Sequence, residues 1–86
     1  ASYPEEIARA AASAAAAQAE AEDARQNLAK KQEAYESSGG RSVSRDTVDT
    51  ASAAYSVRMA KADEANAQYR LMQAGARTED IGEAEA

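Results

Sequence analysis

The chain has 86 residues, a net charge of −5, and no cysteine, histidine, tryptophan or phenylalanine. Its apolar residues are mostly alanines, which favour helices but add little to a core when buried, so a large globular core is excluded. Disulfides, thiolate metal sites and the usual catalytic pairs are excluded as well, and the acidic balance argues against a nucleic-acid partner. No stretch approaches the roughly 18 apolar residues of a membrane span.

The first predicted element is a helix over residues 4–37. Pro4 suits the first turn of a helix, and Glu5 and Glu6 follow where the helix dipole favours negative charge. Apolar residues recur every seven positions along this stretch, at Ile7, Ala14, Ala21, Leu28 and Tyr35. Secondary positions alternate with them at Ala10, Ala17, Ala24 and Lys31. Such spacing is typical of a coiled-coil seam.

A tip loop is predicted over residues 38–43, where Gly39 and Gly40 stand among serines and interrupt the helical pattern. The second helix is predicted over residues 44–74. Ser44 is its expected N-cap, with Ser42 as the alternative, and Asp46 and Asp49 follow in the first turns. These two carboxylates are expected to be dipole partners rather than metal ligands.

The second helix repeats the heptad in mirror image. Its main positions are Val48, Tyr55, Ala62, Tyr69 and Ala76, and each pairs with one position of the first series so that the two residue numbers add to 83. One register therefore satisfies both series, which predicts an all-α, antiparallel coiled-coil hairpin. Ser52, Met59 and Asn66 are the expected secondary positions. Asn66 would either fix the register or lie at the wet edge of the seam.

Gly75 is predicted to take a left-handed conformation just past the end of the second helix. A junction over residues 75–78 and the start of a third helix over residues 79–86 would follow. Residues 78–84 echo residues 4–10 at a constant offset of 74, with Ile81 in the place of Ile7. The chain is therefore expected to be a single hairpin taken from a longer protein in which this helix start occurs twice.

Three segments resemble one family in the right order around the hairpin. The run Gly75-Ala76-Arg77-Thr78-Glu79-Asp80-Ile81, then Ala84-Glu85-Ala86, is similar to a junction found in haemolysin-D-type membrane fusion proteins, also called periplasmic adaptors. Tyr3-Pro4-Glu5-Glu6-Ile7 is similar to the junction before their α-hairpin. The run from Ser44 to Ala51 is similar to the opening of the hairpin's second helix. The resemblance covers essentially the whole chain.

The resemblance implies a docking and conduit-forming hairpin in efflux or secretion. Such adaptors bridge an inner-membrane transporter to an outer-membrane channel, assemble as a homo-oligomeric ring, and touch the channel with their hairpin tips. The expected location is the periplasm, with the parent protein anchored at the inner membrane. The part that meets the transporter would lie outside these residues.

Four residues are the candidate docking site at the tip: Lys31, Tyr35, Arg41 and Ser44. The resemblance implies that the family's tip uses an Arg, a Leu and a Ser; here Ser44 matches, while Lys31 and Tyr35 replace the Arg and the Leu. The spacing from Tyr35 to Ser44 is about two residues longer than is usual in the family. Each residue also has a purely structural interpretation: a snorkelling lysine, seam packing, a solvated turn residue and a helix cap.

Other classes of function are expected to fit less well. No enzyme activity, cofactor or metal is predicted, since the serines lack an orienting base and no phosphate-binding loop is present. The main alternative is a self-assembling coiled-coil hairpin from another filament or needle-like assembly. A helix lying on a membrane surface would need larger apolar residues and a more basic polar face.

Overall fold

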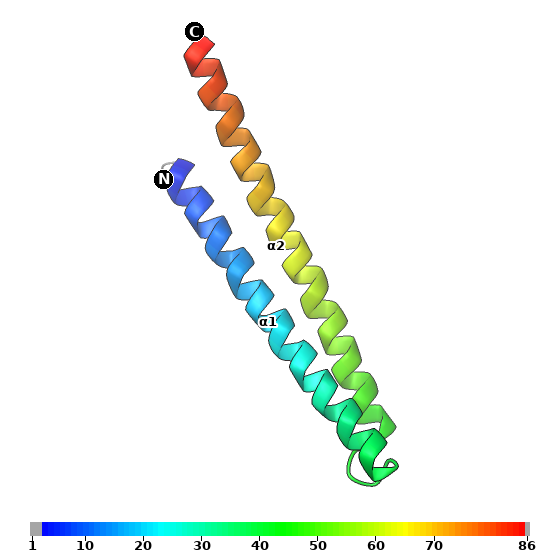
Figure 1. Cartoon of the computed structure of the whole chain (residues 1–86). Helices are drawn as coiled ribbons and strands as arrows, with labels where there is room; N and C mark the ends of the chain where they lie inside the picture. The colour runs from blue at the N-terminus through cyan, green and yellow to red at the C-terminus, as the bar shows by residue number, and fades with distance from the viewer. Residues whose placement is uncertain (1–2, 86) are drawn as a thin grey trace.

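Two α-helices joined by one short loop make up the fold (Figure 1). The computed structural model describes the backbone of residues 3–85 and the side chains of residues 3–77. Helix α1 spans Tyr3–Ser38 and helix α2 spans Arg45–Glu85, and they lie antiparallel against each other. The predicted all-α helical hairpin is confirmed. At the tip, both helix ends fall within one residue of their predicted positions.

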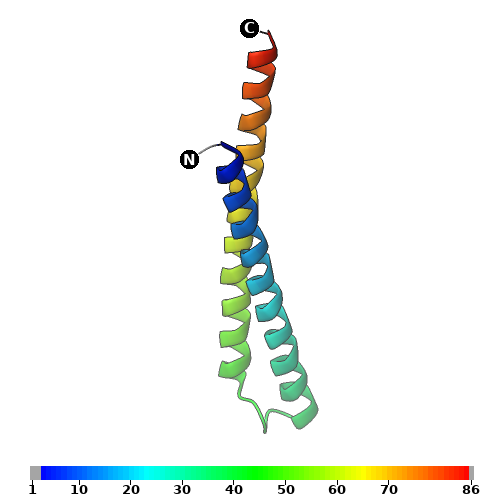
Figure 2. The same cartoon turned by 90° about the vertical axis from the view of Figure 1, so that its left-hand side faces the viewer.

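The hairpin is a thin rod that measures 69 × 16 × 15 Å. At the end opposite the loop, the two helices lie side by side in Figure 1 and overlap in Figure 2, whereas at the tip they overlap in Figure 1 and lie side by side in Figure 2. The helices therefore wind about each other along the rod. This winding is the expected result of a seven-residue apolar repeat on both helices. Helix α2 is the longer helix, and its last turns extend beyond the start of α1 (Figure 1).

The seam between the helices follows the predicted mirror register. Ala14 and Ala21 of α1 and Val48 and Ala62 of α2 are buried, and Ala14 is only 3% exposed. The remaining main positions are half-buried; they are Ile7, Leu28, Tyr35, Tyr55, Tyr69 and Ala76. Small side chains thus occupy the most buried main positions, where they let the two backbones approach closely.

The secondary positions are correct on α1 and partly wrong on α2. Ala10, Ala17, Ala24 and Lys31 are half-buried as predicted. On α2, however, Ser52 is exposed and Met59 is 43% exposed, while Ala51 is buried at 5% exposure. Near the tip, the residue three positions after Val48 therefore faces α1 more closely than the residue four positions after it. Asn66 is half-buried, as expected for the edge of the seam.

The predicted end of the second helix at Ala74 is wrong, because α2 continues without a break to Glu85. Gly75 keeps a helical backbone, and positive φ angles occur among the described glycines only at Gly39 and Gly40. The predicted junction over residues 75–78 and the third helix start are therefore parts of α2. Alanine on both sides of Gly75 offsets the roughly 1 kcal/mol cost of a glycine within a helix.

Gly75 has a packing role instead of a capping role. The hydroxyl of Tyr3, at the start of α1, lies so close to Gly75 that a Cβ there would collide with it. A glycine at this position therefore leaves room for the first side chain of α1 to lie against α2. Of the two similar segments, only residues 4–10 lie at the start of a helix, whereas residues 78–84 lie within α2.

Candidate docking site at the hairpin tip

The tip begins where α1 is closed by two glycines. Gly39 and Gly40 have φ angles of 63° and 82°, which L side chains rarely adopt. The Gly40 N–H donates to the Tyr35 carbonyl at 2.9 Å, and the Gly39 N–H donates to the Glu36 carbonyl at 3.4 Å. This pair of bonds is a Schellman motif, which satisfies the free carbonyls at a helix end. The turn direction of the chain is thus fixed by backbone geometry.

Serine hydroxyls then tie the loop to the end of α1. Ser38 Oγ donates to the Ala34 carbonyl at 2.6 Å, and Ser42 Oγ donates to the same carbonyl at 3.2 Å. The Ser42 N–H donates to Ser38 Oγ at 3.1 Å. Ser42 is therefore bound to α1, which removes it as the alternative cap of α2. These bonds hold the loop against the end of α1.

Ser44 caps α2, as the sequence predicts. Its Oγ accepts a hydrogen bond from the Thr47 N–H at 3.1 Å and lies 2.9 Å from Thr47 Oγ1. Its carbonyl accepts the first bond of the helix, from the Val48 N–H at 3.3 Å. This is the geometry of an N-cap that bonds the third residue of its helix. Ser44 is exposed, so the capping hydroxyl lies at the surface of the tip.

Tyr35 joins the two helices and the loop. The ring is half-buried, and a Cβ added at Gly40 would lie 3.3 Å from its Cε2 atom, so the loop backbone packs on the ring. On the other helix, the Arg45 guanidinium lies 5.9 Å from the ring centroid, within the range of a cation–π contact. Arg45 also pairs with Asp49, with 3.4 Å between Nε and Oδ1. Tyr35 is thus packed on two sides near the end of the rod.

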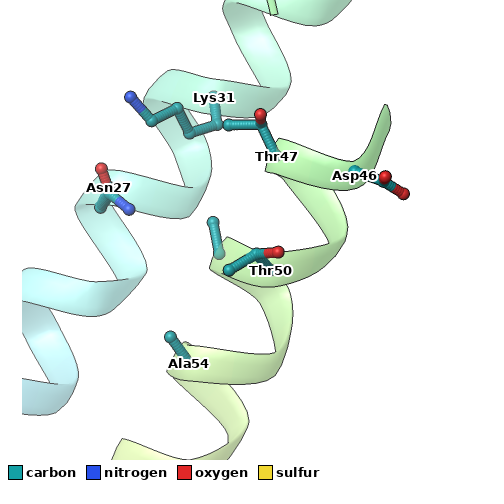
Figure 3. Close-up of a pocket in the computed structure, with 7 residues that line it drawn as sticks. Asn27, Lys31, Asp46, Thr47, Thr50 and Ala54 are labelled. Carbon is teal, nitrogen blue, oxygen red and sulfur yellow. The ribbon is translucent and has the colours of Figure 1, made fainter. Parts of the chain in front are cut away.

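Lys31 lies one helical turn before Tyr35 and lines an open groove. The groove runs between the helices over Asn27, Lys31, Asp46, Thr47, Thr50, Ala51 and Ala54. Figure 3 shows the Lys31 side chain extending with its ammonium directed away from α2, while the Asp46 carboxylate points to the opposite side. The stem of Lys31 covers the edge of the seam and its charge reaches water. Lys31 and Asp46 therefore leave the groove open between them.

Arg41 is an exposed cation within the loop that joins α1 and α2. Its backbone N–H donates to the Ser38 carbonyl at 3.4 Å. Within residues 3–77, ion pairs form only between Arg25 and Glu22 and between Arg45 and Asp49, so no carboxylate pairs with the Arg41 guanidinium. Arg41 therefore presents its full donor set to solvent at the tip.

The ion pair along the rod perturbs one carboxyl group. Arg25 lies 2.6 Å from Glu22, and Gln26 donates to the same carboxylate at 3.3 Å. The hydrogen bond that Arg25 donates lowers the pKa of Glu22 to about 2, and the hydrogen bond from Gln26 makes a smaller contribution to this shift. Glu22 therefore keeps its charge and its contact with Arg25 in mildly acidic solution. This pair lies on the shaft, away from the tip.

The structure thus gathers three of the four predicted site residues into one place. Tyr35, Arg41 and Ser44 lie in or beside the tip loop, and Lys31 lies one turn down the rod. Sequence reasoning missed Arg45, although it stands one turn before Val48, which pairs with Tyr35 in the mirror register. Residues three apart on a helix share a face, and this signal could have found the contact.

Two features are absent from the described part of the chain. No helix there is long and apolar enough to cross a membrane. Across the same part of the chain, no three or more acidic, histidine or cysteine side chains gather as they would around a metal ion.

No protein-family model, curated protein or solved structure matches this chain, so its relationship to periplasmic adaptors remains a resemblance.

Proposed function

We propose that this chain is the docking and conduit-forming hairpin of a periplasmic adaptor that links an inner-membrane transporter to an outer-membrane channel in efflux or secretion. The grouping of candidate docking residues at the tip carries the proposal. Tyr35, Arg41 and Ser44 occur together at one end of a rod 69 Å long, where an end-on contact would meet them first. The resemblance assigns the contact with the channel to this end.

Contact geometry is the mechanism that this proposal implies. Hairpins packed side by side would enclose a conduit, and their tips would mesh with helical ends of the channel. The exposed Arg41 guanidinium supplies five donors for carboxylates or carbonyls of that partner. Arg45 is held by Tyr35 and Asp49, so it would support the tip rather than reach out from it.

A second candidate is a self-assembling hairpin of another filament or needle-like assembly. The exposed Val57 and Leu71 on α2 favour it, because apolar side chains on an outer face suit contacts between copies. In such an assembly the tip would contact another copy of the same chain. The two candidates therefore differ in what Arg41 touches.

Photo-cross-linking from the tip tests the proposal. A benzophenone amino acid placed at Arg41 in the complete protein, in cells of its source organism, is expected to capture an outer-membrane protein. The matched control is the same substitution at Gln18, which is exposed on the shaft and should not capture it. Mass spectrometry of the adducts identifies the partner. Adducts of Arg41 that contain only copies of the same protein would favour the filament candidate instead.

A further inference from the structure

The first residue of α2 has a charge that its position in the helix disfavours. Arg45 directly follows the Ser44 cap, where the free N–H groups of the first turn give the helix end a partial positive charge. A cation at this end destabilises a helix, whereas the neighbouring Asp46 has the sign that the dipole favours. A residue that breaks a local rule of helix chemistry is expected to serve a purpose outside its own helix.

Arg45 has such a contact outside its helix, with Tyr35 of α1. The guanidinium carbon lies 5.9 Å from the centre of the tyrosine ring, and the face of an aromatic ring attracts a cation at this range. Asp49, one turn further along α2, lies 3.4 Å from Arg45 Nε. This ion pair is exposed to water, so it adds little stability by itself. It holds the arginine side chain from its own helix and so restricts how the guanidinium meets the ring.

Tyr35 carries this contact on to the loop. Its carbonyl accepts the Gly40 N–H at 2.9 Å, and a Cβ added at Gly40 would lie 3.3 Å from ring atom Cε2 and 3.7 Å from Cζ. Tyr35 therefore packs on Gly40 through its ring and bonds to it through its backbone. Arg41 is the next residue of the chain, so the position of the Tyr35 ring affects the direction in which Arg41 leaves the turn.

We propose that Arg45 is a positioning residue of the tip, which holds the Tyr35 ring against Gly40 and so fixes the direction in which the loop presents Arg41. The inference rests on the proposed function for the partner that Arg41 meets, and adds the residue through which α2 controls the loop. Serine hydroxyls tie the loop to α1, whereas Arg45 links it to α2 through the Tyr35 ring. A loop held from both helices loses less conformational entropy when a partner binds.

Amide hydrogen exchange at Gly40 tests the positioning role in the purified chain. Arg45→Gln removes the cation, keeps a polar side chain, and relieves the unfavourable charge at the start of α2. Exchange of the Gly40 N–H is expected to become about twofold to fivefold faster, as suits the loss of an exposed cation–π contact. The rate is compared with that of the Ala21 N–H in the buried seam, which reports on opening of the whole hairpin. An unchanged ratio of the two rates would overturn the proposal.

Three further variants separate positioning from a general effect of charge. Arg45→Lys keeps a cation within reach of the ring and should exchange more slowly at Gly40 than Arg45→Gln. Arg58→Gln removes the same charge from an exposed position in the middle of α2 and should leave Gly40 unchanged. In a Tyr35→Leu background, Arg45→Gln should have no further effect, because the ring through which it acts is absent. An equal effect with and without the ring would overturn the route through Tyr35.

Photo-cross-linking in cells tests the consequence for docking. In the complete protein, Arg45→Gln is expected to lower the yield of the channel adduct formed by a benzophenone at Arg41, and Arg45→Lys to retain it. A full yield from Arg45→Gln would overturn the positioning role even if the loop is loosened.

The positioning role and the proposed function fail separately. Hydrogen exchange uses only the purified chain, so its outcome does not depend on any outer-membrane protein. Faster exchange at Gly40 without any channel adduct from Arg41 would count against the adaptor proposal and leave the link from Arg45 to the loop intact. A channel adduct from Arg41 with an unchanged exchange ratio would reject the positioning role alone.

Discussion

Ser38, Ser42 and Ser44 at the tip satisfy backbone groups at the two helix ends. Ser38 and Ser42 both donate to the Ala34 carbonyl, and Ser44 accepts from the Thr47 N–H. Short hydroxyl side chains suit these positions because they reach local backbone groups without strain. Of the three, only Ser44 is bound solely to α2, so it can be replaced without loosening the end of α1.

Ser44 allows its capping and docking roles to be separated. Ser44→Ala is expected to lower the free energy of unfolding by about 1 kcal/mol, because the Thr47 N–H loses its acceptor. Ser44→Asp retains an acceptor and should keep the stability close to that of the parent chain. Urea unfolding followed by circular dichroism measures both effects.

The same pair of variants bears on the docking role. If the adaptor proposal holds, Ser44→Asp in the complete protein abolishes transport although its helices are intact, because a new charge enters the contact surface. Normal transport by Ser44→Asp would remove Ser44 from that surface. Equal stability of Ser44→Ala and the parent chain would contradict the capping role.

Local residue chemistry made much of the tip predictable. The cap at Ser44 and the turn at Gly39 and Gly40 follow from side-chain reach and from glycine's access to positive φ. The contact of Arg45 with Tyr35 follows only when the three-residue spacing from Arg45 to Val48 is combined with the mirror register of the two helices, so local rules alone do not give it. The roles of Lys31, Tyr35, Arg41 and Ser44 in docking stay predictions.

Among the elements, α2 tests how a glycine behaves inside a long helix. Gly75→Ala is expected to raise the free energy of unfolding by about 0.5–1 kcal/mol through helix propensity, less the cost of moving the Tyr3 hydroxyl. The gain should therefore be larger in a Tyr3→Ala background than in the parent chain. Thermal unfolding of the four chains of this double-mutant cycle measures the difference.

Gly39→Ala is the matched control for that substitution. Gly39 has a φ of 63°, so the added Cβ strains the backbone and the variant should be less stable than the parent chain. Opposite signs at Gly75 and Gly39 are the expected result. A loss of stability from Gly75→Ala that persists in the Tyr3→Ala background would contradict the helical conformation of Gly75.

Heptad spacing predicted both helices and their register, since folding the chain back on itself is the simplest way to bury both mirrored series, which include Ala21 and Ala62. The predicted break at Gly75 was wrong for a physical reason. A glycine followed by Thr78 and two acidic residues has the composition of a helix stop and a new start. Helix-forming neighbours and the space needed by Tyr3 outweigh those local signals.

For the whole molecule, a seam of alanines implies modest stability in isolation, because each buried methyl adds little. Association between copies then adds to the stability of the folded state by mass action. The Tm of the purified chain is therefore expected to rise over an approximately hundredfold increase in concentration. A Tm that is independent of concentration in the parent chain would contradict association.

The rod shape governs how such association must be measured. The radius of gyration is 19.5 Å, whereas a compact chain of this length would have about 12 Å. A single copy of 9.0 kDa therefore diffuses as slowly as a considerably heavier globular protein. Elution volume in gel filtration would report a false oligomer even for a monomer. Sedimentation equilibrium, which depends on buoyant mass and not on friction, gives the true number of copies.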